Sequence, residues 1–318
     1  MRGRGKKRVT FALAMAATVL VGAGCAAEEQ PEPKAATGSA RPTASAAPTS
    51  PAPTSPAPAP SAPASPTPSA PASPWDVAPA SLAAVGDSVT RAFDACAVLA
   101  DCPEASWATG TDTAVNSLAV RLLGPGKAAT RTWNLARTGA RMAELPEQMA
   151  RAAAEKPGLV TVMMGANDAC RPTPAQMTPV ADFRFSFETA LARLREDAPK
   201  ALVYVTSLPD LRHLWSTGRL GAGPDVWKLG ICGSMLADPD DLGAAAERRR
   251  AAVRERVVAY NGVLAEVCAK DRLCRYDGGA VFAYRFGSGQ LSAWDWFHPS
   301  VAGQARLAEI AYERITGR

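Results

Sequence analysis

The chain has 318 residues, among them 27 prolines, and 15 of these prolines fall within residues 31–79. The formal net charge of +5 comes mostly from residues 1–75, because the rest of the chain carries 28 Lys and Arg against 27 Asp and Glu. This near balance argues against a nucleic-acid partner, which would require a basic surface.

The first 25 residues have the pattern of an export signal. Five basic residues lie within residues 1–8, and the uncharged apolar run at 9–24 is shorter than the ~20 residues of a membrane-spanning helix. The run ends in Val21-Gly-Ala-Gly-Cys25, which is similar to the lipobox of bacterial lipoproteins, with Gly22 in place of the usual Leu. We expect export with lipidation of Cys25; secretion without lipidation is the alternative.

Residues 26–75 predict a disordered linker. They repeat Ala-Pro, Ser-Pro and Thr-Pro and have no apolar periodicity, so they cannot bury enough surface to fold, and proline favours extended conformations. We expect a stalk between an anchor on the outer face of the cell membrane and a domain at residues 76–318. That domain is long enough for one hydrophobic core.

Apolar runs and helical patterns alternate along the domain. Strands are predicted at residues 81–85, 131–136, 159–164, 201–207 and 273–276. Helices are predicted at residues 87–99, 111–123, 141–155, 185–197, 242–269 and 301–315. The alternation predicts an α/β domain with a central parallel sheet and helices on both faces.

Six cysteines remain when Cys25 is set aside, an even number in an exported protein, where disulfides form and persist. They allow 15 connectivities, and the sequence alone does not choose among these. Two pairs are only six residues apart, and short loops favour local pairing, which leaves one long-range pair. The favoured pairs are Cys96–Cys102, Cys268–Cys274 and Cys170–Cys232. A zinc site is disfavoured, because the chain has no Cys-x-x-Cys pair and two His in total.

Four short motifs follow predicted strands or precede the last helix. They are Gly86-Asp-Ser-Val89, Gly139 within residues 134–141, Gly165-Ala-Asn-Asp168 and Asp295-Trp-Phe-His298. Each motif alone is explained equally well by a turn, a cap or a glycine conformation. Together, at the strand ends where α/β sheets form their sites, they supply a hydroxyl, a base, an orienting carboxylate and oxyanion donors.

With these motifs in order over residues 81–318, the chain resembles the SGNH (GDSL-type) hydrolases. The strings GANDAC and DWFHPS are most similar to secreted actinobacterial and phospholipase B-like esterases and lipases. The resemblance implies a flavodoxin-like three-layer α/β/α sandwich that hydrolyses esters or thioesters without a metal or organic cofactor. It implies Ser88 as the nucleophile, His298 as the general base and Asp295 as the orienting acid. The implied oxyanion donors are the backbone N–H groups of Ser88 and Gly139 and the side-chain amide of Asn167.

Other polar and aromatic residues near the motifs have structural explanations. We expect Asp87 and Asp168 to stabilise turns and His213, the second His, to pack in a loop or at the surface. Residues 284–291, rich in Gly and Ser, could form a flap. Three aromatic residues either line an acyl pocket or pack in the core: Trp294, Trp296 and Phe297.

The sequence thus predicts an exported, lipid-anchored, monomeric serine hydrolase that acts on lipid or small acyl esters through an acyl-enzyme. Transfer of the acyl group to another acceptor, or removal of O-acetyl groups from a polysaccharide, would use the same intermediate, and the sequence does not separate these reactions. A non-catalytic surface module is the third alternative, but such a module is expected to lack a catalytic residue, and all of them are present.

Overall fold

The computed structural model describes residue 75 and residues 77–317. The export signal at 1–25, Cys25 and nearly all of the linker at 26–75 lie outside these described residues. Within residues 75 and 77–317, no helix combines the length and apolarity needed to cross a membrane.

The described residues form one central sheet of five parallel strands in the order β2-β1-β3-β4-β5. The strands are β1 (Leu82–Gly86), β2 (Thr132–Asn134), β3 (Leu159–Met163), β4 (Leu202–Val205) and β5 (Cys274–Tyr276). All residues of β1, β3 and β4 are buried, as expected for strands covered on both faces. This strand order is the flavodoxin-like one, so the predicted fold is confirmed.

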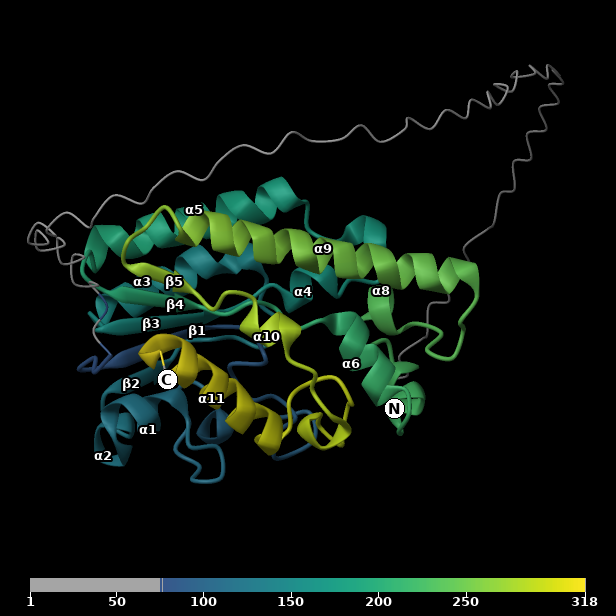
Figure 1. Ribbon diagram of the computed structural model, residues 1–318, viewed down its shortest axis with the longest axis horizontal. Helices are drawn as coiled ribbons and strands as arrows, with labels where there is room; N and C mark the ends of the chain where they lie inside the picture. Colours follow the sequence, from purple (N-terminus) through teal and green to yellow (C-terminus); the bar gives the residue numbers. More distant parts are fainter. Residues whose placement is uncertain (1–74, 76, 318) are drawn as a thin grey trace, which may run out of the picture. The chain divides into compact units, whose positions relative to one another are not determined.

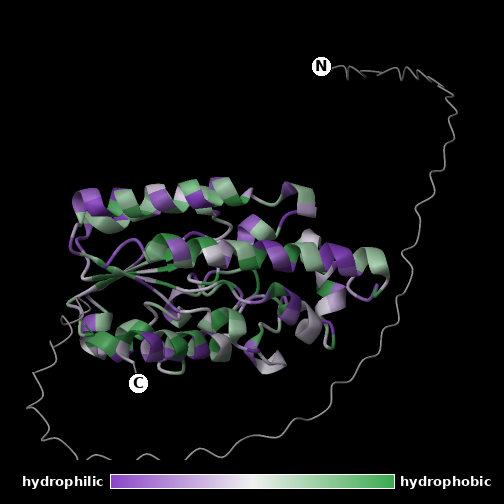
Figure 2. Cartoon of the chain, turned by 45° about the horizontal axis from the view of Figure 1, so that its top comes forward, coloured by the Kyte–Doolittle hydropathy of each residue, from purple (hydrophilic) through white to green (hydrophobic). Residues whose placement is uncertain are grey.

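Helices cover both faces of the sheet. The longer ones are α3 (Leu145–Ala154), α5 (Val180–Asp197), α6 (Leu211–Gly218), α9 (Ala244–Cys268) and α11 (Val301–Thr316). The shorter ones are α1 (Leu118–Leu123), α2 (Pro125–Ala128), α4 (Ala166–Ala169), α7 (Gly223–Trp227), α8 (Gly233–Leu236) and α10 (Ala280–Ala283). Figure 1 shows α3, α5 and α9 over one face and α1 and α11 over the other. Figure 2 shows the same three layers, with hydrophobic and hydrophilic residues alternating along the helices.

Helix α9 shows how the apolar pattern translates into packing. Its predicted apolar face is buried and consists of Val253, Val257, Tyr260, Leu264 and Val267. Tyr260 stacks on Phe183 of α5 with the ring centroids 4.0 Å apart. The spacing of apolar residues in the sequence therefore identified the face that packs on the rest of the domain.

The segment after β1 is not the helix that its sequence predicted. Residues 88–99 form successive turns, and the backbone has positive φ at Ala92, Asp94 and Leu99 (51°, 56° and 51°). A residue with left-handed backbone angles cannot continue a right-handed helix, so the helix predicted from the apolar pattern is wrong here.

The helix predicted at 111–123 begins only at Leu118. Asn116 has a positive φ of 48°, which excludes it from the helix. Ser117 then caps the helix, because its side chain accepts a hydrogen bond of 3.3 Å from the N–H of Val120. The other predicted elements are present with shifted boundaries.

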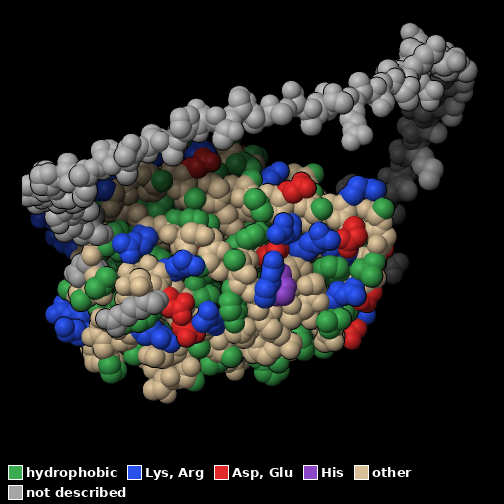
Figure 3. Space-filling view, viewed as in Figure 1, with side chains coloured by type: hydrophobic (Ala, Val, Ile, Leu, Met, Phe, Trp, Pro, Cys, Tyr) green, Lys and Arg blue, Asp and Glu red, His purple; other side chains and the backbone are tan. Residues whose placement is uncertain are grey.

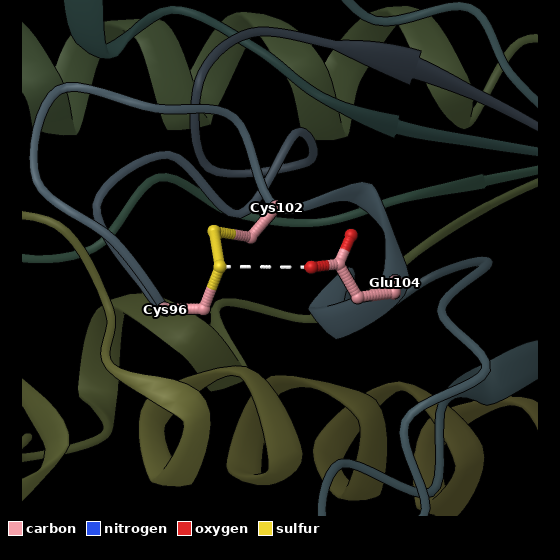
Figure 4. A group of neighbouring side chains, drawn as sticks. All are labelled: Cys96, Cys102 and Glu104. Carbon is pink, nitrogen blue, oxygen red and sulfur yellow. Dashed lines mark hydrogen bonds between the residues drawn. A yellow bond between two sulfur atoms is a disulfide. The ribbon is translucent and has the colours of Figure 1, made fainter.

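Three disulfides connect loops and helix ends, and they are the pairs that the sequence favoured. They join Cys96 to Cys102, Cys170 to Cys232 and Cys268 to Cys274. Figure 4 shows the first of them beside Glu104, with Oε1 of Glu104 3.6 Å from Sγ of Cys96. Because both sulfur atoms are bonded to each other, this group does not offer the thiolates of a zinc site.

Charged side chains of both signs are interspersed on the surface. On the face shown in Figure 3, Lys and Arg lie among acidic and uncharged residues. Ion pairs account for some of this mixing, for example Arg212 with Glu247 at 2.6 Å and Arg254 with Asp210 at 3.0 Å.

Candidate active site

The predicted nucleophile lies in a tight turn at the carboxyl end of β1. Gly86 ends the strand with a φ of 151°, and a Cβ atom there would lie 2.3 Å from the carbonyl oxygen of Met163 on β3. Only glycine permits this approach. Gln148 of α3 fixes the same residue, because its side chain accepts from the N–H of Gly86 at 2.8 Å and donates to its carbonyl at 2.9 Å. The turn that carries Ser88 therefore starts at a rigidly held strand end.

A hydrogen-bonded chain joins Ser88 to the predicted base and acid, although Ser88 and His298 are 210 positions apart. Nε2 of His298 lies 2.8 Å from Oγ of Ser88, and Nδ1 lies 2.5 Å from Oδ2 of Asp295. Oδ1 of Asp295 accepts from the backbone N–H groups of Phe297 and His298, both at 2.9 Å. The carboxylate favours the tautomer with hydrogen on Nδ1, which leaves Nε2 free to accept the serine proton.

The other two predicted oxyanion donors, Gly139 and Asn167, follow strands β2 and β3. Gly139, in the turn after β2, has a φ of 81°, a conformation that glycine adopts readily. Asn167 lies in the short helix α4 after β3, and its amide donates to the carbonyl of the adjacent Ala140 at 3.0 Å. This bond uses one N–H of the amide and leaves the second for a substrate oxygen.

The chain matches a known protein family over most of its length. The profile of the family described as "GDSL-like Lipase/Acylhydrolase" matches residues 82–311. The chain belongs to this family. A search of curated proteins finds no significant match to this chain.

Three solved structures are similar to this GDSL-family chain, and each match spans nearly the whole length of the solved chain. The structure reported as that of TesA is 19% identical, with a TM-score of 0.43, and the match covers 74% of this chain and 98% of that one. An extracellular lipase from Streptomyces rimosus is 19% identical (TM-score 0.42, 73% and 97% covered). Phospholipase A1 from Streptomyces albidoflavus NA297 is 18% identical (TM-score 0.42, 74% and 98% covered).

The electrostatics of the GDSL-family site suit a general base. Burial lowers the pKa of His298, but the hydrogen bond to Asp295 and the charge of Asp295 outweigh burial, so the pKa lies above the usual 6.5. Burial would raise the pKa of Asp295, and the hydrogen bonds from His298 and the backbone lower it instead. The pair is thus arranged to stabilise a protonated imidazole beside an ionised carboxylate.

Two further acids next to the motifs support the backbone. Oδ1 of Asp87 accepts from the N–H of Val89 at 3.0 Å, as expected of a turn residue, and burial raises the pKa of Asp87 to about 6. Oδ2 of Asp168 accepts from the N–H of Met142 at 2.9 Å, and burial raises the pKa of Asp168 as well. Both contacts agree with the structural role that the sequence suggested.

An apolar slot lies beside His298. Its volume is about 30 Å³. Val89, Leu214 and Phe297 contribute to its walls, as do Phe286 and Leu291 from the predicted flap.

Of the three aromatic residues near the base, Phe297 lines this slot, whereas Trp294 is 48% exposed. Trp296 packs beside Gly221 of the loop after α6. His213 packs against the predicted flap, with Nε2 3.1 Å from the carbonyl oxygen of Phe286. His213 therefore lies in helix α6 and not in a loop, half-buried against residues of the predicted flap.

The sequence motifs do not identify two buried glutamines whose side chains fix the backbone around the site. Gln148 fixes Gly86 as described above. Gln304 of α11 accepts from the N–H of Trp107 at 2.9 Å and donates to the carbonyl of Val89 at 2.9 Å. Both glutamines lie on the apolar faces of predicted helices, and a polar residue on such a face was the signal available in the sequence.

Proposed function

We propose that this protein is a serine ester hydrolase that works through an acyl-enzyme. The observation that carries the proposal is the unbroken hydrogen-bonded chain from Ser88 through His298 to Asp295. Membership in the GDSL-like lipase/acylhydrolase family supports the same chemistry.

The geometry of this chain supports each step. Nε2 of His298 takes the proton of the Ser88 hydroxyl as Oγ attacks the ester carbonyl, and the imidazolium that forms is stabilised by Asp295. The oxyanion is bound by the N–H groups of Ser88 and Gly139 and by the free N–H of Asn167. His298 then protonates the leaving alcohol. Water, deprotonated by His298, attacks the acyl-enzyme, and His298 returns this proton to Oγ of Ser88 as the bond to Oγ breaks and the acid is released.

The slot beside His298 supports the proposal that the preferred substrates carry a small apolar acyl group. Its apolar lining favours hydrocarbon over polar groups, and its volume of about 30 Å³ leaves little room without movement. A longer chain would have to displace Phe286 and Leu291, which are buried. The proposed substrate class is therefore a carboxylic ester with a short acyl chain.

Export and lipid anchoring are part of the proposal and rest on residues 1–25. Three disulfides among the described residues suit an oxidising compartment outside the cytosol. Lipidation of Cys25 would hold the domain at the outer face of the cell membrane. Cys25→Ser is expected to move the protein from the membrane fraction to the medium. Unchanged fractionation would contradict the anchor and leave the hydrolase proposal intact.

Ser88→Ala tests the enzyme proposal. The variant is expected to lose about 10⁶-fold in kcat for p-nitrophenyl acetate, because the acyl-enzyme cannot form. Its thermal unfolding should match that of the wild type, since the change removes one hydroxyl at a turn. Ser300→Ala, which removes a serine hydroxyl from the N-cap of α11, is the matched control and should keep the rate. Hydrolysis by Ser88→Ala at the wild-type rate would end the assignment.

A further inference from the structure

A second carboxyl group lies beside the proposed catalytic acid. Asp94 is 2% exposed, and one of its carboxyl oxygens, one of Asp295 and one ring nitrogen of His298 all lie within 4.8 Å of one another. Neither the sequence motifs nor the mechanism above assigns Asp94 any role.

The surrounding contacts fix Asp94 in this place. Its backbone N–H donates to the carbonyl of Ala100 at 2.9 Å, and its own carbonyl accepts from Oγ of Ser292 at 2.6 Å. Oδ1 of Asp94 accepts from the N–H of Leu99. One carboxyl oxygen is therefore occupied by the loop itself, and the carboxyl group stays within 4.8 Å of the Asp295 carboxylate.

The hydrogen bonds of Asp295 leave a place for one more donor. An ionised carboxylate has about four acceptor positions. Three are taken, two by the backbone N–H groups of Phe297 and His298 and one by Nδ1 of His298. Asp94 can occupy the fourth only as a donor, and a carboxyl group donates only when it is protonated.

We propose that Asp94 is a positioning residue of the active site, whose protonated carboxyl donates a hydrogen bond to the Asp295 carboxylate and so holds it against His298. This inference rests on the proposed function, because Asp295 and His298 are the proposed catalytic pair. The proton stays on Asp94 throughout the reaction, and the carboxyl pair carries a single negative charge opposite the imidazolium.

Burial and the charges around the Asp94 carboxyl raise its pKa, the direction that favours a proton on this group. Burial, followed by the negative charge of Asp295, raises the pKa of Asp94, whereas the N–H of Leu99 and a charged His298 act in the opposite direction. Asp87, from the turn after β1, also faces His298. Two buried carboxylates this close are costly to ionise together, so the shift in the pKa of Asp94 is in the direction that favours its protonated form.

Infrared spectroscopy of the resting protein tests the proton directly. The wild type at neutral pH is expected to show the carbonyl stretch of a protonated carboxyl that disappears in Asp94→Asn. Asp182→Asn, the same change at an exposed position on α5, should leave the spectrum and the activity unchanged. Identical carboxyl bands in the wild type and Asp94→Asn would overturn the proposal. Because this readout needs no turnover, it can fail or succeed independently of the hydrolase assignment.

Kinetics test the positioning role. Asp94→Gly removes the carboxyl without a penalty for the positive φ, and it is expected to lower kcat by about 10- to 100-fold, as for a lost hydrogen bond to a charged group. Asp94→Asn keeps a donor at a residue that tolerates this φ, so it should recover about tenfold of that loss. Equal kcat values for the two variants would contradict the role.

The pH profile separates a neutral from an ionised Asp94. A negative charge on Asp94 would raise the pKa of His298, so its removal would shift the acid limb of kcat/KM to lower pH. If Asp94 is protonated, the acid limbs of Asp94→Asn and the wild type should coincide. A shift to lower pH in Asp94→Asn would overturn the proposal.

Discussion

The two halves of the candidate site are held in different ways. The nucleophile half, with Ser88, Gly139 and Asn167, lies at the carboxyl ends of three neighbouring strands. The base half, with Asp295 and His298, lies on a loop at residues 291–300 that contains neither a helix nor a strand.

Hydrogen bonds of side chains and backbone groups fix the base half. The carbonyl of Asp295 accepts from Nε1 of Trp227 at 2.8 Å, and the N–H of Ser292 donates to the carbonyl of His298 at 2.7 Å. The parallel sheet therefore positions the nucleophile half, whereas individual hydrogen bonds position the base half. Replacement of Asp295 in the base half should therefore alter the pH dependence, and replacement of Asn167 in the nucleophile half should alter the rate alone.

Asp295→Asn should produce the largest effect in this comparison, because it disrupts the base half at its centre. We expect kcat to fall by roughly 10³- to 10⁴-fold, since an amide cannot stabilise the imidazolium. Asp295 raises the pKa of His298, so its removal should move the acid limb of kcat/KM from above 6.5 to lower pH. Stopped-flow rates across a pH series measure both effects. An unshifted limb would mean that Asp295 does not set the basicity of His298.

Asn167→Ala probes the nucleophile half. Loss of one oxyanion donor should lower kcat by about 10²- to 10³-fold. The acid limb of the pH profile should stay in place, because Asn167 carries no charge. Asn134→Ala, which removes an amide bonded to the carbonyl of Thr90, is the comparison variant and should lose far less activity. A loss that appears only in KM would argue that Asn167 binds the substrate and not the oxyanion.

Leu291→Ala tests the slot where the two halves meet and should have the smallest effect on the chemistry. The shorter side chain widens the slot, so the ratio of kcat/KM for butyrate to that for acetate esters is expected to rise about tenfold. Leu194→Ala, the same change in α5 away from the slot, should cost similar stability, ~2–5 kcal/mol, and leave the ratio unchanged. A ratio that changes equally in both variants would contradict the assignment of the slot.

The sequence predicts the nucleophile half better than the base half, for physical reasons. Strands and the glycines that end them leave local patterns, so the positions of Gly86 and Gly165 could be inferred. Turns with positive φ at non-glycine residues leave no such pattern, so residues 88–99 were predicted as a helix. Asp94 was missed because its significance depends on contacts with Asp295, about two hundred residues away.

Features that arise from packing could not be predicted. The slot is formed by side chains from many elements, among them the turn after β1, β3, α6, α11 and residues 286–299, and its volume depends on how all of them pack. Motifs identify which residues take part in the site, but the space between these residues is a property of the folded chain.

Covalent labelling of Ser88 is the most direct test of the central claim that Ser88 is activated by His298. A fluorophosphonate should react once per molecule, with Oγ of Ser88 displacing fluoride, and mass spectrometry should locate the adduct on the peptide that contains Ser88. His298→Ala should abolish the labelling although the serine is still present. An adduct on another residue, or undiminished labelling in His298→Ala, would contradict the account.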